Sequence, residues 1–151
     1  MRIPPVLHPL EPAHVLLVDD NRGGLAARKT IIEELGHKVS LATGSEDALT
    51  QFTAAKFDLV ITDHRLSRLN GVELIRKLRA IRPMVPILLL SGYVEALGLT
   101  EANTGADAVL PKSANEVTHL IRAVTRLLRP KAVRKPPAAQ RRRAIAKRQE
   151  R

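Results

Sequence analysis

Short segments rich in apolar residues recur along the chain, and several of them end at a polar or acidic residue. Continuous apolar runs of four or five residues are typical of strands that are buried on both faces of a parallel sheet. The pattern predicts five strands, at residues 15–18, 38–42, 59–63, 87–90 and 106–110.

Between these segments, apolar residues return at the three- and four-residue spacing of an amphipathic helix. The first helix is closed by Gly36, and Ser45 is placed to cap the second. The third follows a turn at Asn70-Gly71, and a weaker fourth spans about residues 94–103.

The last predicted helix begins with the capping box Ser113-Ala114-Asn115-Glu116 and stops at Pro130. The alternation of five strands with five helices predicts an α/β fold, a doubly wound five-stranded parallel sheet with helices on both faces. In such sheets, ligands bind beyond the carboxyl ends of the strands, near the switch in strand order.

The pattern covers only the middle of the chain, and we expect three segments. Residues 1–13 contain four prolines and form an extended leader, and residues 14–129 form the domain. The segment 130–151 holds nine Lys or Arg and one Glu, a net +8 of the total +10, which leaves +2 for residues 1–129. We expect this basic tail to be disordered when free, and the basicity to belong to it and not to the domain.

Composition excludes several classes of protein. The chain has no cysteine, so a disulfide framework or a thiolate metal site is ruled out. No apolar run approaches the roughly 20 residues of a transmembrane helix, and the N-terminus has no apolar stretch of the kind found in secretory signals. We therefore predict a cytoplasmic protein without a transmembrane segment.

Three aspartates stand at predicted strand ends: Asp19 and Asp20 after the first strand and Asp63 at the end of the third. Carboxylates brought together repel one another unless a cation joins them, and Mg²⁺ favours oxygen ligands. A carboxylate can also attack phosphorus and form an acyl phosphate. Ser91, after the fourth strand, and Lys112, after the fifth, are placed to neutralise the charge that then develops.

Taken together, these residues resemble the receiver domain of two-component response regulators over roughly residues 14–129. The resemblance rests on four motifs in order: Val18-Asp19-Asp20, Asp63 with Gly71 eight residues later, Ser91-Gly92, and Lys112. It implies a flavodoxin-like receiver fold, Mg²⁺ as cofactor, and a sensor histidine kinase or histidine phosphotransfer protein as phosphoryl donor. It also implies a stand-alone regulator that catalyses only its own phosphorylation and dephosphorylation, with an unknown output protein.

The resemblance further implies a role for each residue. Asp63 is the phosphoryl acceptor and a metal ligand, Asp20 binds Mg²⁺ directly, and Asp19 binds it partly through water. The remaining implied contacts are the backbone carbonyl of Arg65 on the metal and the side chains of Ser91 and Lys112 on phosphoryl oxygens.

Some positions depart from the family pattern. Val109 stands where an aromatic residue usually reports phosphorylation, and Tyr93 is a candidate substitute. Arg65 and Tyr93 occupy two positions that tune hydrolysis in the family. Because both are large, we expect them to obstruct the attacking water and to prolong the life of the phosphoryl state.

Two other functions remain open. A phosphate hydrolase with an aspartyl nucleophile usually carries a second acid two residues later, and Arg65 at that position argues against it. Alternatively, the domain is a receiver-like scaffold whose basic tail, residues 131–151, binds nucleic acid independently of phosphorylation. The same tail is also explained as a solvated segment that only adds solubility, or as a contact for an acidic protein or membrane surface. It contains no aromatic residue to stack on bases.

Overall fold

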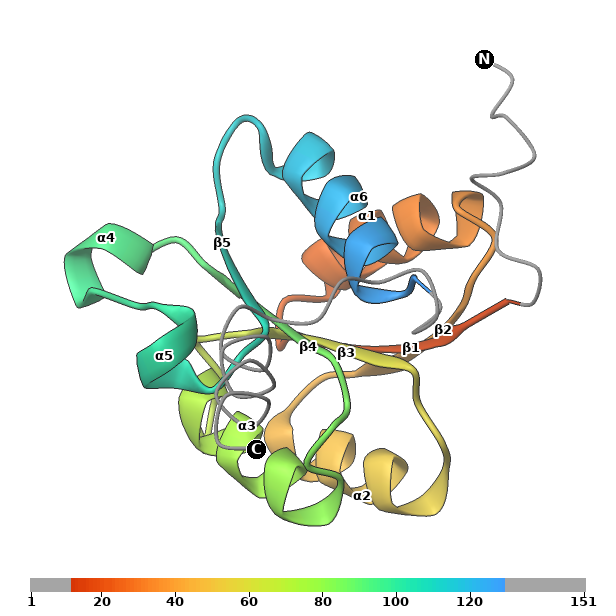
Figure 1. The fold of residues 1–151 in the computed structure, drawn as a ribbon, viewed down its shortest axis with the longest axis horizontal. Coiled ribbons are helices and arrows are strands. Elements are labelled where there is room, and N and C mark those ends of the chain that lie inside the picture. The colour runs from red at the N-terminus through yellow and green to blue at the C-terminus, as the bar shows by residue number, and fades with distance from the viewer. Residues whose placement is uncertain (1–11, 130–151) are drawn as a thin grey trace, which may run out of the picture.

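The structure is a computed structural model, and it describes residues 12–129 as one α/β domain (Figure 1). The predicted basic tail, and all but the last two residues of the predicted leader, lie outside the described residues.

Five parallel strands form a single sheet in the order β2-β1-β3-β4-β5. The strands are β1 (His14–Val18), β2 (Lys38–Ala42), β3 (Leu59–Asp63), β4 (Ile87–Ser91) and β5 (Ala108–Pro111). The three central strands are buried along almost their whole length, whereas the edge strand β2 is partly exposed. The prediction of a doubly wound parallel sheet is confirmed.

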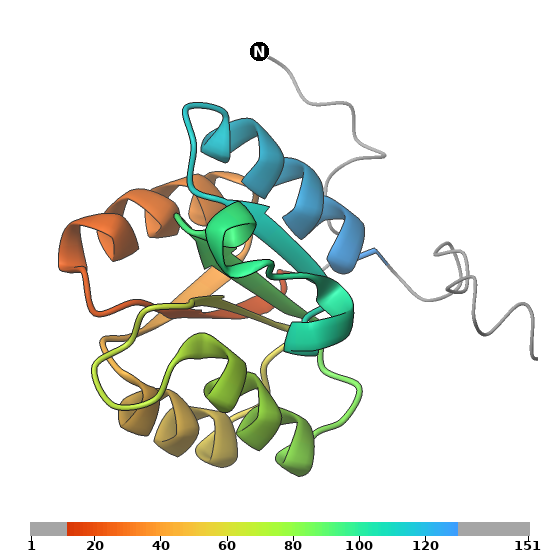
Figure 2. The same ribbon diagram turned by 90° about the vertical axis from the view of Figure 1, so that its left-hand side faces the viewer.

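Helices cover both faces of this sheet (Figures 1 and 2). One face carries α1 (Arg22–Glu34) and α6 (Glu116–Leu127), and the other carries α2 (Ser45–Ala54) and α3 (Gly71–Ile81). Two short helices, α4 (Val94–Leu97) and α5 (Glu101–Thr104), lie on the side of the edge strand β5.

The core consists of two aliphatic layers, because successive side chains of a strand point to opposite faces of the sheet. In β1, Leu16 and Val18 pack with the side chains of α2 and α3, whereas Val15 and Leu17 pack with those of α1 and α6. The side chains of both layers are almost fully buried, so the ends of the strands are held in fixed positions relative to one another.

The predicted fourth helix is divided in two by Gly98. This glycine has a φ of 62°, in the left-handed region, and its N–H donates to the carbonyl of Glu95. A new helix then begins at Glu101, and the hydroxyl of its N-cap Thr100 accepts from the N–H of Asn103. The prediction of five helices is therefore wrong, and the described residues contain six.

The fifth strand begins two residues later than predicted, at Ala108. Gly105, with a φ of 81°, ends α5, and the hydroxyl of Thr104 accepts the N–H of Ala106. Because these residues complete a helix end and its turn, the chain joins the sheet only beyond them.

Two predicted helix caps are also wrong. Gly44, and not Ser45, is the N-cap of α2, and no side chain caps that helix. The capping box predicted at Ser113 and Glu116 does not form, because the carboxylate of Glu116 binds Arg28 instead. A capping box is found at the start of α3, between the N-cap Asn70 and Glu73, and a second at the start of α5.

Candidate functional site

The carboxyl ends of β1 and β3 lie side by side at the point where the strand order switches. This is the place where open α/β sheets bind ligands. Asp19 and Asp20 follow β1, and Asp63 is the last residue of β3. One carboxylate oxygen from each residue lies within 4.8 Å of the other two. The structure thus brings the three predicted acids into one cluster.

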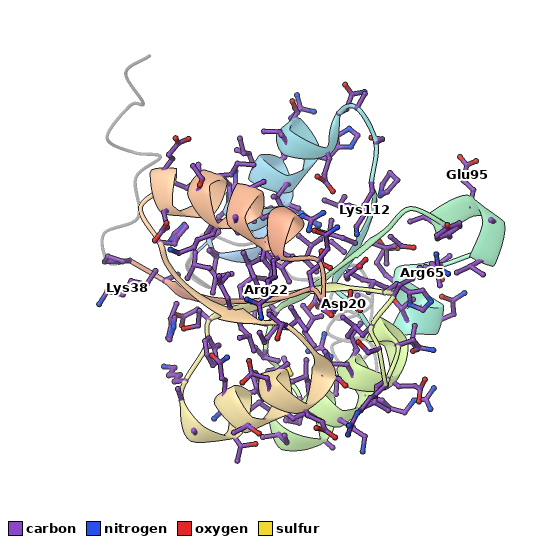
Figure 3. All side chains as sticks on the ribbon, turned by 180° about the vertical axis from the view of Figure 1, so that it is seen from behind. Asp20, Arg22, Lys38, Arg65, Glu95 and Lys112 are labelled. Atoms are coloured by element: carbon purple, nitrogen blue, oxygen red, sulfur yellow. The ribbon has the colours of Figure 1, made fainter. Side chains whose placement is uncertain are left out.

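Lys112 reaches this cluster from the end of β5. Its Nζ lies 3.0 Å from Oδ1 of Asp63 and 3.9 Å from Oδ2 of Asp19. Figure 3 shows Lys112, Asp20 and Arg65 at one end of the sheet, while Lys38, at the start of β2, lies at the opposite end. The lysine side chain is 31% exposed, so its ammonium group faces both the acids and solvent.

Burial controls the protonation of Asp63, whose side chain is only 9% exposed. Desolvation raises the pKa of Asp63, and the nearby Asp19 raises it further. The pKa is lowered by Lys112 and by the backbone N–H of His64, which donates to Oδ1 at 2.9 Å. Burial is the larger effect, so the pKa of this carboxyl lies above its ordinary value of 3.8. A cation at the cluster would favour the ionised form.

The two neighbouring acids have different surroundings. Asp20 is exposed, and its Oδ2 accepts from the hydroxyl of Ser67 at 3.2 Å. Asp19 is buried, and its Oδ1 accepts from the N–H of Asn21 at 2.9 Å. Its Oδ2 accepts from Arg28 at 2.8 Å. Asp20 is therefore the acid of this pair that faces solvent.

Arg28 is a site residue that sequence reasoning missed. Its position carried a signal, because Leu25 lies three residues before it and Ile32 four residues after it, and both are buried. An arginine within the apolar face of a helix needs a buried partner, and Asp19 lies nine residues earlier at the end of the preceding strand. The apolar positions alone predict the first helix and do not identify this arginine.

Ser91 ends β4, one residue beyond the partner of Asp63 in the ladder. It is buried, and its Oγ accepts from the N–H of Tyr93 at 3.0 Å. Because the hydroxyl acts as acceptor in that bond, its own proton remains available for another partner. Its predicted contact with a phosphoryl oxygen stays a prediction.

Arg65 and Tyr93 line a pocket of about 430 Å³. The guanidinium of Arg65 donates to the Tyr93 hydroxyl at 3.1 Å and lies 5.0 Å from the centre of the ring. The pocket is also lined by His64, Leu66, Asn70 and Leu97. The two residues predicted to flank the acceptor therefore contact each other. The predicted metal contact of the Arg65 backbone carbonyl stays a prediction.

The acid cluster is chemically suited to Mg²⁺. This ion takes oxygen ligands at about 2.1 Å in octahedral geometry, so oxygens on opposite sides of it are about 4.2 Å apart. Three carboxylate oxygens within 4.8 Å of one another meet this requirement after small adjustments. Asp20 is exposed, which leaves room for the waters that Mg²⁺ usually keeps.

The fold and this cluster define a receiver domain, and sequence comparison agrees. The chain belongs to the response regulator receiver domain family, whose pattern it matches over residues 15–125. Receiver domains of this family are in general phosphorylated on an aspartate in an Mg²⁺-dependent reaction, as part of two-component signalling. None of the helices among residues 12–129 combines the length and the apolar character needed to cross a membrane.

Relatives share part of their length with this chain. A gliding motility regulatory protein of Myxococcus xanthus is 32% identical over 116 residues, which is 75% of this chain and 15% of the relative. The transcriptional regulatory protein ZraR of Escherichia coli is 30% identical over 93 residues, which is 61% of this chain and 21% of the relative. The chain thus spans about a fifth or less of the length of these two relatives.

Solved structures show the same fold. The response regulator TrrA of Thermotoga maritima, in complex with Mg²⁺ and BeF, has a TM-score of 0.69 and 29% identity, and covers 77% of this chain and 99% of its own. A receiver domain protein of Clostridium thermocellum has a TM-score of 0.69 and 28% identity, over 77% of this chain and 94% of its own.

Proposed function

We propose that this chain is a response regulator that accepts a phosphoryl group on Asp63 from a histidine kinase or a histidine phosphotransfer protein. The observation that carries the proposal is the position of Lys112, with its Nζ 3.0 Å from Asp63, beside a cluster of three carboxylates. A purely structural ion pair would not require two further acids at the same strand ends. The chain would act as a regulator and not as a conventional enzyme.

The proposed reaction is a transfer between two side chains. A carboxylate oxygen of Asp63 attacks the phosphorus of a phosphohistidine, an O–P bond forms, the P–N bond breaks, and the electron pair leaves with the imidazole. Asp19, Asp20 and Asp63, with the backbone carbonyl of Arg65, would hold Mg²⁺, which supplies positive charge to the phosphoryl oxygens. Lys112 and Ser91 would bind the phosphoryl oxygens through their own donors.

The test is phosphorylation of the wild type and of Asp63→Asn by acetyl phosphate, with and without Mg²⁺, followed by intact mass. We expect one added phosphoryl group that requires both Asp63 and the metal. BeF with Mg²⁺ should shift backbone NMR resonances near Ser91 and Lys112 in the wild type alone. A folded wild type that takes no phosphoryl group and shows no such shifts would contradict the proposal.

The output is proposed to be protein binding through the surface beside the acceptor, formed by the last two strands and the helices next to them. Tyr93 is 47% exposed and Leu97 is 54% exposed, so this surface offers apolar contacts close to the site. Val109 is partly buried against the core, and we propose that Tyr93 takes over the reporting role of the aromatic residue that is missing there. The identity of the output partner and the cytoplasmic location stay predictions.

The contact between Arg65 and Tyr93 supports a slow loss of the phosphoryl group. Together they line a pocket that also includes His64, the residue after Asp63. We propose that they obstruct the water that would attack the phosphorus. Replacing both by alanine is expected to raise the rate of hydrolysis severalfold, measured as the decay of the phosphorylated mass after removal of acetyl phosphate. An unchanged decay, from a variant that is phosphorylated normally, would contradict this role.

A second candidate function is that of a receiver-like scaffold whose basic segment, residues 131–151, binds nucleic acid or another acidic partner. It is favoured by the net +8 of residues 130–151, against +2 for the rest of the chain. The two functions differ in one respect: in the scaffold, binding is independent of the phosphorylation of Asp63.

A further inference from the structure

Arg28 places a positive charge in the interior of the domain, with 7% of the residue exposed. Its Nη1 donates to Oδ2 of Asp19 at 2.8 Å, and its Nη2 donates to Oε1 of Glu116 at 3.0 Å. Its Nε is buried and has no hydrogen-bond partner among the described residues. The guanidinium thus links the acid cluster after β1 to the first residue of α6.

The space for this ion pair depends on Gly24. A Cβ atom at Gly24 would lie 3.0 Å from Nη1 of Arg28 and 3.2 Å from Oδ2 of Asp19. Any other residue would therefore press on the contact. The first turn of α1 is thus shaped to let the arginine reach the acid that precedes the helix.

Arg28 and a metal ion would use the same carboxylate. Asp19 has one oxygen bound to the N–H of Asn21 and the other to Arg28, and Lys112 lies 3.9 Å from that second oxygen. Positive charge next to a cation site opposes the arrival of a divalent cation, most strongly where solvent is excluded. The buried arginine therefore neutralises part of the charge that would attract the metal.

We propose that Arg28 is a positioning residue that lowers the affinity of the acid cluster for Mg²⁺ and transmits its occupancy to α6. The inference rests on the proposed function of the cluster as a metal site. When Asp19 turns towards a bound cation, its hold on Arg28 weakens, and the guanidinium moves towards Glu116. No side chain caps the N-terminus of α6, so this contact helps to fix the position of that helix end.

Two substitutions should change metal affinity in opposite directions. Arg28→Met removes the opposing charge and is expected to tighten Mg²⁺ binding up to about tenfold, equivalent to about 1.4 kcal/mol. Glu116→Gln leaves Arg28 with Asp19 as its remaining acidic partner, so Mg²⁺ binding should weaken severalfold. The measurement is a titration of the full chain with MgCl₂, followed through the NMR shift of the Asn21 amide and by calorimetry.

Lys29→Met is the matched control, because it removes the same charge from the same helix. Lys29 is 42% exposed at its side chain and pairs with Glu33 at 3.8 Å, so its removal should leave Mg²⁺ affinity unchanged. Glu116→Gln keeps the test informative if Arg28→Met folds poorly, since Glu116 lies at the surface end of the contact. Unchanged affinity in both Arg28→Met and Glu116→Gln, or a weakening in both, would overturn the proposal.

The transmission of Mg²⁺ occupancy from the acid cluster to α6 is measured separately. Saturation with Mg²⁺ should shift the amide resonances of Glu116 and Val117 in the wild type, and these shifts should be lost in Arg28→Met. Equal shifts in both proteins would overturn the transmission to α6. If neither protein binds Mg²⁺, the inference fails together with the metal site.

Phosphorylation of Asp63 by acetyl phosphate is measured in a separate experiment, which distinguishes the proposed function from the role of Arg28. A wild type that is phosphorylated on Asp63 but has the same Mg²⁺ affinity as Arg28→Met would refute the role of Arg28 alone. A tighter Arg28→Met, with no phosphorylation of the wild type, would refute the proposed function and leave the role of Arg28 standing.

Discussion

At the scale of single residues, Asp63 combines two demands that oppose each other. As the proposed nucleophile and metal ligand, Asp63 would need to be ionised, but burial disfavours the ionised form and raises the pKa of Asp63. Lys112 and the N–H of His64 offset part of that cost. Without a cation, the domain is therefore less stable with an ionised Asp63 than it would be with a neutral side chain at this position. Such a cost is common at functional residues.

This cost predicts how Asp63→Asn changes stability. In the absence of Mg²⁺, the folded-state pKa of Asp63 is raised, so its ionisation destabilises the fold once the pH exceeds 3.8, fully so above the raised pKa. The neutral asparagine does not carry this penalty. The advantage of the variant should therefore grow as the pH rises from 3.8 towards neutrality, measured by urea denaturation in EDTA. Added Mg²⁺ should stabilise the wild type more than the variant, and an advantage independent of pH would contradict this account.

Gly71 is required for a different reason, which is close approach of the backbone. Its N–H donates to the carbonyl of His64 at 2.7 Å, and a Cβ would lie 2.7 Å from both the Asp63 carbonyl and a methyl group of Leu89. Gly71→Ala should therefore destabilise the domain by about 1–3 kcal/mol, the usual cost of overpacking, as measured by chemical denaturation. Gly92→Ala is the control, because apart from its chain neighbours no atom lies within 4 Å of the Cβ that it adds. Equal stability of the two variants would show that the contact relaxes without cost.

Which residues form the cluster could be predicted from the sequence, since acids at the ends of buried parallel strands must meet at one edge of the sheet. Asp19, Asp20, Asp63 and Lys112 were found in this way. Arg28 was not, because the helix was predicted from its apolar positions alone. Its second partner, Glu116, is also 88 residues away in sequence, and their contact depends on how α1 packs beside α6.

At the scale of elements, the strands and long helices could be predicted because their apolar spacing is dictated by burial on both faces of the sheet. The predictions of helix ends were wrong where a local sequence signal competes with a tertiary contact. Glu116 has the spacing of a capping-box acid, yet a buried arginine offers it a charged partner. The fourth helix has no buried residue between Val94 and Leu97, so the left-handed Gly98 was free to end it.

Substitutions at the observed capping box of α3 and at the predicted box of α6 should therefore change the stability of the domain by different amounts. The side chain of Asn70 accepts from the N–H of Glu73 at 2.9 Å, so Asn70→Ala should destabilise the domain by about 1 kcal/mol. Ser113 caps no helix N–H, so Ser113→Ala should change stability by less than about 0.5 kcal/mol. Thermal and urea denaturation of both variants measure the difference. A cost of Ser113→Ala as large as that of Asn70→Ala would restore the predicted box.

At the scale of the whole molecule, the domain and the basic segment have different charge. Residues 1–129 carry +2, with the acid cluster at one end of the sheet, while residues 130–151 carry +8. The two proposed activities would thus lie in different parts of the chain, the phosphoryl acceptor in the folded domain and the electrostatic binding site in the basic segment. Phosphorylation of Asp63 changes the charge of the first and leaves the composition of the second unaltered.

The charge of residues 130–151 predicts how the binding of DNA would depend on salt concentration and on DNA sequence. If about half of its nine cations contact phosphates, the logarithm of the binding constant for duplex DNA should fall with the logarithm of salt concentration with a slope of about −4. Two duplexes of unrelated sequence should bind equally, because contacts to phosphates carry no sequence information. Fluorescence anisotropy of the full chain at several salt concentrations measures both properties.

The matched variants separate the segment from the domain. Deleting residues 131–151 should abolish binding, and replacing Arg141, Arg142 and Arg143 by glutamine should reduce the slope by about 3 if all three contact phosphates. If the domain is a scaffold, Asp63→Asn should bind DNA with the same affinity as the wild type. Treatment of the wild type with acetyl phosphate should then leave its affinity for DNA unchanged. If phosphorylation changed the affinity for DNA, the domain would instead control binding by the basic segment. Salt-independent binding, or binding that survives the deletion, would show that the basic segment is not the nucleic-acid site.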